Sequence, residues 1–341
     1  MDTVIITGCA GLLGSHFSRH LLQSGYRVVG IDDLSGGYAD YLPREIDHPD
    51  CDNFEFWPMD LSEIGSLARL EECFSRESPL ACFHFAAYAA EGLSPFIRHF
   101  NYTNNILASS NVINACVNHD TKLVFTSSMA VYGKQHPPFS EGMLPAPIDP
   151  YGIAKYAVEM DIKQAHEQFG LRYSIIRPHN VVGIYQNIWD KYRNVAGIFI
   201  RRVISGEPML IYGDGEQTRA FSDIKYYMEP FERLIHGCSG YTFNIGADKT
   251  ITINELADTV QRVASQNGYE ATREHVEARH EAKHAHSDHT LAKDPRTLNF
   301  HDGTNLEVLI GEMFEWALSQ PNRKQKTMDY EIQKGMYEYW K

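Results

Sequence analysis

Tyr151 and Lys155 are the residues of this sequence whose types and spacing first suggest proton-transfer chemistry. They are four positions apart, so in a helix both side chains lie on one face and the ammonium can approach the phenol. A free tyrosine titrates near pH 10 and is a poor base at neutral pH, but a nearby positive charge stabilises its phenolate. The pair is therefore a candidate acid/base unit, although the same spacing also occurs in ordinary amphipathic helices.

Two serines, Ser127 and Ser128, follow the apolar run of residues 123–126. If that run is a parallel strand, its end lies at the carboxyl edge of the sheet, where ligands bind. Ser128 can then hydrogen-bond the substrate oxygen that Tyr151 deprotonates. A serine pair alone is usually structural, and its combination with the tyrosine and the lysine is what indicates a catalytic site.

Glycines recur at positions 8, 11 and 14, between an apolar run and a helical pattern. Such glycines permit a tight turn and let the backbone approach a pyrophosphate at the helix N-terminus, although three glycines alone can be merely a turn. Asp32 and Asp33 follow about 18 residues after the last glycine, where a carboxylate can bind the adenosine ribose and repel a 2′-phosphate. This favours NAD over NADP. Asp60 and Leu61 are candidates for contact with the adenine, with a helix N-cap as the alternative role of Asp60.

The elements that must position these residues alternate between strand-like and helix-like patterns through the first half of the chain. We expect strands at residues 4–6, 27–31, 54–57, 81–85, 123–126 and 173–176, and helices over 12–22 and 105–117. This alternation is typical of an α/β fold with a doubly wound parallel sheet of the Rossmann type.

The pattern loosens after Arg177, where loops rich in Gly, Asn and Pro appear. We predict an NAD-binding Rossmann domain over residues 1–177, to which a later segment at about 220–246 returns. Residues 178–330 are predicted to form a smaller, mixed α/β, substrate-binding C-terminal domain that caps the site. It includes a strand at 241–245 and amphipathic segments at 254–265 and 306–318, and the tail from Gln320 becomes aromatic towards its end.

Composition narrows the possible partners. The 341 residues carry a formal net charge of −13 without a dense run of Lys or Arg, so we expect neither nucleic acid nor a membrane surface as a partner. A phosphate-bearing substrate then needs a few local arginines. The six cysteines are scattered, the N-terminus does not resemble a leader, and the sequence has no run of about 18 apolar residues. We therefore expect a cytoplasmic protein without disulfides.

Taken together, these motifs closely resemble the extended short-chain dehydrogenase/reductase family, and within it the UDP-glucose 4-epimerase-like enzymes of the NAD-dependent epimerase/dehydratase group. The likeness covers nearly the whole chain. It is carried by residues 7–14, 32–34, 84–87, 127–133, 151–155 and 177–183. The resemblance implies that Tyr151 is the acid/base, that Lys155 lowers its pKa and holds the nicotinamide ribose, and that Ser128 orients the sugar 4-hydroxyl.

The resemblance also implies a set of binding residues. The cofactor NAD would be bound by Gly8, Gly11, Leu12, Leu13, Gly14, Asp32, Asp33, Asp60, Leu61, Phe85, Ala86, Ala87, Asn104, Ser127, Tyr151, Lys155 and Pro178, with residues 84–87 lining its channel. The nucleotide-sugar substrate, with UDP favoured as its nucleotide, would be bound by Ser128, Tyr151, Asn180, Asn194, Met209, Tyr212, Arg219 and Arg279. Arg219 would grip the diphosphate, with a salt bridge to an acidic residue as its alternative role. Family members often form homodimers and need no metal, so we expect a homodimer, and the four histidines of residues 280–289 are not assigned to a metal site.

The implied activity is 4-epimerisation: a hydride leaves C4 of the sugar for NAD⁺, the 4-keto sugar rotates, and the hydride returns to the opposite face. Related 4,6-dehydratases carry Asp and Glu at the positions of Met129 and Ala130, and related decarboxylases commonly carry the Glu at the second position. Dehydration and decarboxylation would therefore lack an acid or base in this chain. Ala285 falls roughly where related epimerases use a Tyr that excludes an N-acetyl group, which predicts room for UDP-N-acetylglucosamine. Ala89 replaces a Lys of some epimerases, and this weakens the expectation that the cofactor stays bound.

Two alternatives stay open. One is another UDP-sugar-modifying enzyme of the family, such as a UDP-glucuronate 4-epimerase, a decarboxylase, a dehydratase or a dehydrogenase that acts on a uronate. The other is a non-catalytic NAD-sensing module, which typically has lost the Tyr or the Lys. Intact Tyr151 and Lys155 favour an enzyme.

Overall fold

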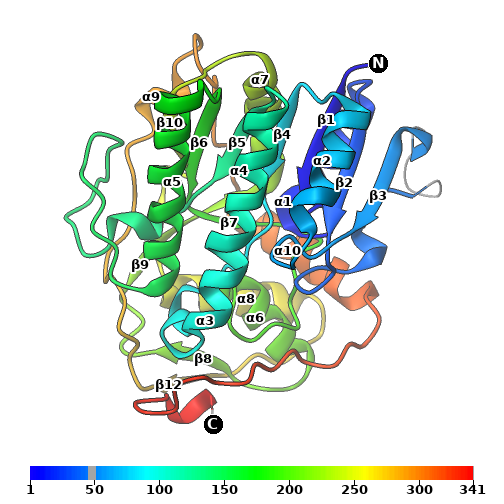
Figure 1. Cartoon of the computed structure of the whole chain (residues 1–341). Helices are drawn as coiled ribbons and strands as arrows, with labels where there is room; N and C mark the ends of the chain where they lie inside the picture. Colours follow the sequence, from blue (N-terminus) through cyan, green and yellow to red (C-terminus); the bar gives the residue numbers. More distant parts are fainter. Residues whose placement is uncertain (45–50, 341) are drawn as a thin grey trace.

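The computed structural model describes residues 1–44 and 51–340, and its central element is a seven-stranded parallel sheet (Figure 1). Its strand order is β10-β6-β5-β4-β1-β2-β3. The strands are β1 (Thr3–Thr7), β2 (Arg27–Asp32), β3 (Phe54–Pro58), β4 (Ala81–His84), β5 (Lys122–Thr126), β6 (Tyr173–Pro178) and β10 (Tyr241–Ile245). Since β1 lies between β2 and β4, the winding reverses there, and ligands bind outside the carboxyl edge at such a point. The predicted Rossmann-type fold is confirmed.

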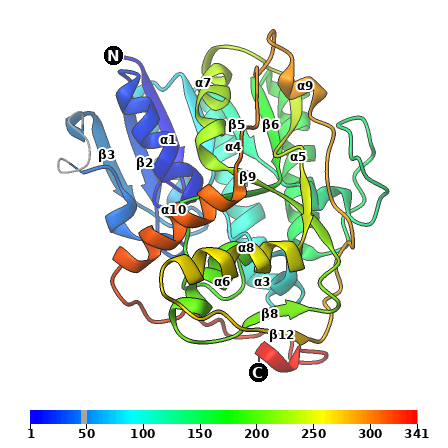
Figure 2. The ribbon, with the colours of Figure 1, turned by 180° about the vertical axis from the view of Figure 1, so that it is seen from behind.

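Helices cover both faces of this sheet. Figure 1 shows α2 (Ser66–Glu77), α4 (Ala108–Asn118) and α5 (Pro150–Phe169) on one face, and Figure 2 shows α1 (Leu12–Gln23) and α7 (Met228–His236) on the other. Successive residues of β1 serve the two layers: Ile5 packs with α2, α4 and α5, whereas Ile6 packs with α1 and α7. This two-residue period explains why the buried parallel strands read as continuous apolar runs.

A smaller part lies beyond the carboxyl edge of the sheet (Figures 1 and 2). It contains the short strands β7 (Asn180–Val182), β8 (Met209–Tyr212), β9 (Thr218–Asp223), β11 (Thr250–Thr252) and β12 (Arg273–Val276), together with the helices α6 (Val195–Ile204), α8 (Ile253–Gln266) and α10 (Leu306–Ser319). The strands form two small sheets, β11-β9-β7 and β12-β8. These helices and sheets share a core of their own, which holds this part together over the site.

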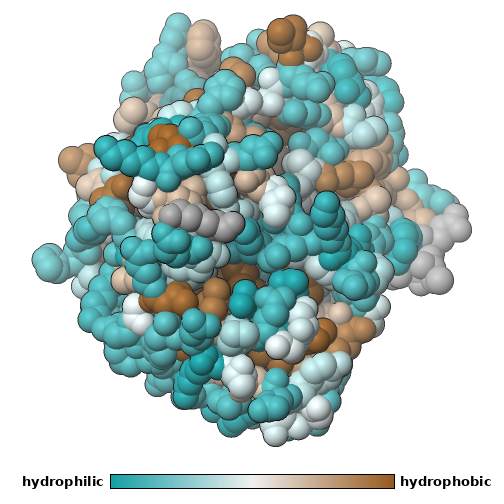
Figure 3. Space-filling view, turned by 90° about the horizontal axis from the view of Figure 1, so that it is seen from below, coloured by the Kyte–Doolittle hydropathy of each residue, from teal (hydrophilic) through white to brown (hydrophobic). Residues whose placement is uncertain are grey.

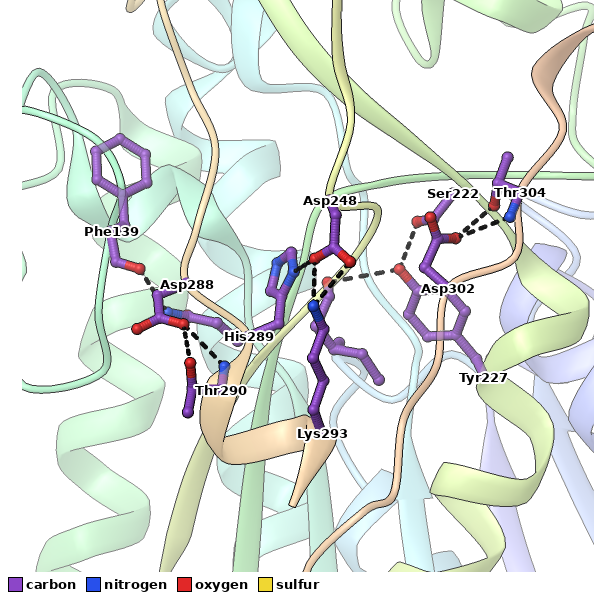
Figure 4. Close-up of polar contacts among 12 residues, drawn as sticks. Phe139, Ser222, Tyr227, Asp248, Asp288, His289, Thr290, Lys293, Asp302 and Thr304 are labelled. Atoms are coloured by element: carbon purple, nitrogen blue, oxygen red, sulfur yellow. Dashed lines mark hydrogen bonds and ion pairs between the residues drawn. The ribbon is translucent and has the colours of Figure 1, made fainter. Parts of the chain in front are cut away.

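Later segments of the chain return to the large sheet. Helix α7 and strand β10 do so, whereas β9 belongs to a small sheet. A further segment, including the one-turn helix α9 (Thr290–Lys293), also packs on the large sheet through Phe300 and its neighbours. Figure 4 shows how this segment is fastened: Asp248 binds both His289 at 3.3 Å and Lys293 at 2.7 Å, and Asp288 donates its N–H to the carbonyl of Phe139 at 2.8 Å.

The C-terminal segment, residues 320–340, runs as an extended strap along the smaller part and the sheet edge (Figure 1). Along it, Glu331 accepts the backbone N–H groups of His99 and Phe100 at 2.7 and 2.8 Å, at the start of α3 (Arg98–Tyr102). At its end, Trp340 is buried in an aromatic cluster with Phe96.

The molecular surface seen in Figure 3 is mostly hydrophilic, and its hydrophobic residues lie in separate patches. Among the described residues, no helix is both long and apolar enough to span a membrane.

Candidate functional site

A cavity of about 640 Å³ opens at the carboxyl edge of the sheet, between the large and the smaller part. Every residue that the sequence predicts for cofactor, substrate and catalysis lines this cavity, except Gly14, His84 and Met209. Residues more than 200 positions apart in the chain, from Gly8 to Arg279, therefore meet in one place.

The glycine loop is packed too closely for side chains. Gly8 has a φ of +73°, and a Cβ there would lie 2.6 Å from the backbone nitrogen of Ala86. A Cβ on Gly14 would lie 2.2 Å from the carbonyl oxygen of Gly8. Gly14 therefore serves the contact between α1 and the loop rather than the cavity, which explains why it does not line the site.

Asp32 fixes this loop. One carboxylate oxygen accepts the N–H of Ala10 at 2.9 Å and the other accepts that of Leu34 at 2.7 Å. The adjacent Asp33 is exposed and binds the N–H of Ser35 at 2.8 Å. At the end of β2 the structure thus places a carboxylate beside the glycine loop, as the sequence predicts for ribose recognition.

Asp60 also lines the cavity, but its alternative role as a helix N-cap is wrong. Its carboxylate accepts the N–H and hydroxyl of Ser62 at 2.8 and 2.6 Å, while α2 begins only at Ser66.

His84, expected in the cofactor channel, does not line the cavity. It lies between the hydroxyls of Thr7 at 2.7 Å and Ser109 at 2.9 Å. Burial lowers the pKa of His84 to about 3, so its ring is neutral.

Tyr151 and Lys155 lie in the first turns of α5, which Asp149 caps by accepting the N–H of Gly152 at 2.9 Å. The Lys155 ammonium donates to the carbonyl of Thr126 at 2.8 Å and lies 5.8 Å from the ring centroid of Tyr151. Burial raises the pKa of Tyr151, and a hydrogen bond from Ser128 acts in the opposite direction. Burial lowers the pKa of Lys155 to about 7.

A buried ion pair supports this centre from behind. The carboxylate of Glu159, one helical turn beyond Lys155, receives two bonds from Arg177 at 2.8 and 2.6 Å, and their side chains are 0% and 2% exposed. Glu159 also accepts the hydroxyl of Ser127 at 2.5 Å and raises the pKa of Lys155 against the effect of burial. The pair therefore links α5 to the ends of β5 and β6 and holds the catalytic residues in register.

Two arginines of the smaller part, Arg219 and Arg279, also line the cavity. The guanidinium carbon of Arg279 lies 3.5 Å from the ring centroid of Tyr212, and its Nη2 is buried without a hydrogen-bond partner among the described residues. Arg219 donates to the carbonyl of Ala282 at 2.8 Å and pairs with Glu281 at 3.3 Å. Arg219 therefore lines the cavity, as expected, and also forms the ion pair that was its alternative role.

Two asparagines and Met209 complete the predicted substrate set. Asn180 and Asn194 donate to the carbonyls of Ala220 and Val181, each at 3.3 Å, and both line the cavity. Met209 points into the core of the smaller part, whereas the next residue of β8, Leu210, lines the cavity. Strand side chains alternate, so residues 209 and 212 face opposite sides and could not both reach the ligand.

Sequence reasoning missed four charged residues that line the cavity, namely Glu91, Asp149, Arg193 and Glu281. Glu91 is exposed within the cavity, whose walls shield it from bulk water. Burial and the neighbouring Asp149 raise the pKa of Glu91 to about 7. Two of these residues could have been found because they lie next to predicted site residues in the sequence. Asp149 precedes Tyr151 by two positions, and Arg193 directly precedes Asn194.

Three of the four histidines of residues 280–289 bind separate partners. His284 lies 2.9 Å from the hydroxyl of Thr218, His280 lies 3.0 Å from Lys134, and His289 pairs with Asp248. Within the described part of the chain, no group of three or more His, Cys, Asp or Glu residues could hold a metal ion.

Comparison with known proteins gives the same picture. The sequence model of the NAD dependent epimerase/dehydratase family matches residues 4–246. A UDP-glucuronate 4-epimerase of Thermodesulfobacterium geofontis is 26% identical, with 93% of this chain and 96% of the relative covered. A UDP-glucose 4-epimerase of Mycolicibacterium smegmatis is 31% identical, over 74% of this chain and 79% of the relative.

Among solved structures, the chain is similar to a UDP-N-acetylglucosamine 4-epimerase from Methanobrevibacter ruminantium in complex with UDP-N-acetylmuramic acid. The TM-score is 0.83 at 29% identity, and the alignment covers 94% of this chain and 99% of the other. The similarity thus extends over both the large and the smaller part.

Proposed function

This chain belongs to the NAD-dependent epimerase/dehydratase family, and on that premise we propose that it is a nucleotide-sugar 4-epimerase acting on UDP-linked sugars. The cofactor is NAD. Its fit to the residues present is supported by the tight turn at Gly8, where a Cβ would clash with the backbone of Ala86, by the carboxylate of Asp32 and by the start of α1. The UDP-sugar names of the similar proteins support the substrate class.

In the proposed reaction, Tyr151 removes the proton of the sugar 4-hydroxyl and later returns it. Ser128 holds that oxygen through its hydroxyl, and the Lys155 ammonium stabilises the phenolate that the proton transfer requires. When bound, NAD⁺ supplies the hydride acceptor for C4 and afterwards the hydride donor. Tyr151 is only 8% exposed, so a bound substrate that fills the cavity would keep water from the transferred proton.

The observation that carries the choice of reaction is the lining beside Ser128. Met129 and Ala130 both face the cavity there, and neither side chain can donate or accept a proton. Elimination of water or loss of a carboxylate needs an additional acid or base at the sugar. Epimerisation needs only the tyrosine, the serine and the cofactor, so it requires no acid or base at positions 129 and 130.

The cavity wall also favours a class of sugar. Ala285 is small, buried and cavity-lining, so it leaves room for an N-acetyl group. Glu91 and Asp149 place two carboxyl groups in the cavity, close enough to Tyr151 for each to raise its pKa. Arg193 acts on the pKa of Tyr151 in the opposite direction, so a C6 carboxylate of the sugar would meet two carboxyl groups and one guanidinium there. We therefore favour UDP-glucose and UDP-galactose, or the N-acetylated pair, over UDP-glucuronate.

Proton NMR of the purified protein with UDP-glucose, UDP-N-acetylglucosamine and UDP-glucuronate, without added reductant, tests the proposal. We expect the anomeric signal of the 4-epimer to grow to equilibrium with at least one neutral sugar, and to be absent in the Tyr151→Phe variant. Loss of CO₂, elimination or accumulation of NADH would assign a different reaction. No change with any of the three sugars would favour the non-catalytic module.

We also propose a homodimer formed through α4 and α5. Leu107, directly before α4, and Ile153 and Met160 on α5 are large apolar side chains that are 50, 42 and 53% exposed. Exposed apolar side chains gathered on two neighbouring helices are typical of a surface that a partner covers. An isologous contact of these helices with a second copy would bury them.

A further inference from the structure

Arg193 lines the cavity with a guanidinium group that is only partly used. Its Nε donates to the carboxylate of Asp190 at 3.1 Å, and its Cζ lies 4.9 Å from the ring centroid of Tyr88. Within residues 1–44 and 51–340, its terminal nitrogens Nη1 and Nη2 have no hydrogen-bond partner. Since the side chain is 19% exposed and faces the cavity, this two-pronged donor is free for a ligand.

The free end of Arg193 lies beside the glycine loop. A Cβ on Gly36 would be 2.6 Å from Nη2 of Arg193, and a Cβ on the next residue, Gly37, would be 2.0 Å from the carbonyl oxygen of Ala10. The segment of residues 36–37 is therefore packed between Arg193 and the glycine loop. A dinucleotide places its diphosphate at this loop, where α1 begins.

The charges around this place call for a cation. The diphosphate carries two negative charges, the chain has a net charge of −13, and Asp32 lies next to the loop. Of the other Lys and Arg residues described in the cavity wall, Lys155 is bonded to Thr126, Arg279 stacks on Tyr212 and Arg219 pairs with Glu281. Residue 89, which also lines the cavity, is an alanine. Among the described residues of the cavity wall, Arg193 is thus the cation that lies beside the glycine loop.

Arg193 is held in place by a buried layer. Asp190 is 0% exposed and accepts the hydroxyl of Tyr88 at 3.2 Å and the N–H of Tyr192 at 3.0 Å, besides Nε of Arg193. The C-terminal strap closes this layer, because Lys326 donates its N–H to the carbonyl of Trp189 at 3.0 Å. The guanidinium is therefore preorganised and need not lose much freedom on binding.

We propose that Arg193, oriented by Asp190, binds the diphosphate of NAD and so retains the cofactor in a chain that has alanine at position 89. The inference rests on NAD as the cofactor and is independent of which sugar is turned over. A diphosphate is also part of a nucleotide-sugar, so the test must separate the two sources. UDP serves as the probe for the second source.

Dissociation constants of the full-length protein for NAD⁺, ADP-ribose, adenosine and UDP, measured by calorimetry and competition, test the proposal. The variant is Arg193→Gln combined with Asp190→Asn, which avoids leaving a buried carboxylate unpaired. The control is Arg201→Gln: Arg201 is also 19% exposed and pairs with Glu207 at 3.3 Å, but does not line the cavity. Melting temperatures show that each variant is folded.

We expect the double variant to bind NAD⁺ and ADP-ribose about tenfold to a hundredfold more weakly, the range for losing hydrogen bonds to a charged group. Adenosine and UDP should bind as before, and the control should match the wild type with all four ligands. Arg193→Lys should lose part of the affinity, because lysine keeps the charge but not the two-pronged geometry. Unchanged NAD⁺ affinity, an equal loss for adenosine, or a loss confined to UDP would each overturn the proposal.

Discussion

Replacing Lys155 by methionine should remove a pH dependence from the stability of the cofactor-free protein. Burial lowers the pKa of Lys155 to about 7, from 10.5 for an ordinary lysine. Between these values the unfolded chain holds a proton that the folded protein has released, so the free energy of unfolding rises with pH. Below pH 7 both states are protonated, and the cost of burying the ammonium is fully present.

The size of the effect follows from the proton difference. Lys155 is 3% exposed, so solvent screens its charge little. Integrating the difference in bound protons from about pH 7 to about pH 9 gives roughly 2 kcal/mol. An unfolding entropy of about 2.1 cal/mol/K per residue gives about 0.7 kcal/mol/K for the whole chain. The melting temperature of the wild type should therefore rise by about 3 °C more over this interval than that of Lys155→Met.

Differential scanning calorimetry of NAD-free protein across this pH range measures the difference. Lys334→Met is the matched control, because Lys334 is exposed and its replacement should leave the wild-type pH profile intact. Comparing variants cancels the other titrating groups, which are common to all three proteins. Parallel profiles for the wild type and Lys155→Met would refute the reasoning, since they would mean that Lys155 does not carry the cost of a buried charge.

Three further changes test other parts of the structure. Glu159→Gln leaves Arg177 buried and unpaired, which should cost about 3–5 kcal/mol and lower the melting temperature by about 4–7 °C; a shift below about 1 °C would contradict the role of this pair. Ala285→Tyr should reduce turnover of UDP-N-acetylglucosamine at least about tenfold relative to UDP-glucose, and an equal loss for both sugars would exclude a selective role. Met160→Lys should halve the mass measured by light scattering to that of one 38.8 kDa chain, whereas an unchanged mass would place the interface elsewhere or exclude a dimer.

The sequence predicted most of the fold because its signals are local. Each strand of the large sheet is an apolar run between turn residues, and the helix that carries Tyr151 begins with a capping aspartate, Asp149, followed by proline. Where tertiary context overrides local pattern, the predictions failed. Asp60 precedes a helix by several residues and does not cap it, and Met209 lies on the face of β8 opposite to Tyr212.

Three features of the site could be predicted from the sequence alone: the dinucleotide-binding loop, the carboxylate at the end of β2 and the pairing of Tyr151 with Lys155. A turn, a strand end and one face of a helix are each fixed by a few neighbouring residues. The folded chain was needed to show that Glu91 and Arg193 face the same cavity and that the C-terminal strap supports Asp190. These arrangements depend on side-chain directions and on contacts between segments far apart in the chain, which no local spacing encodes.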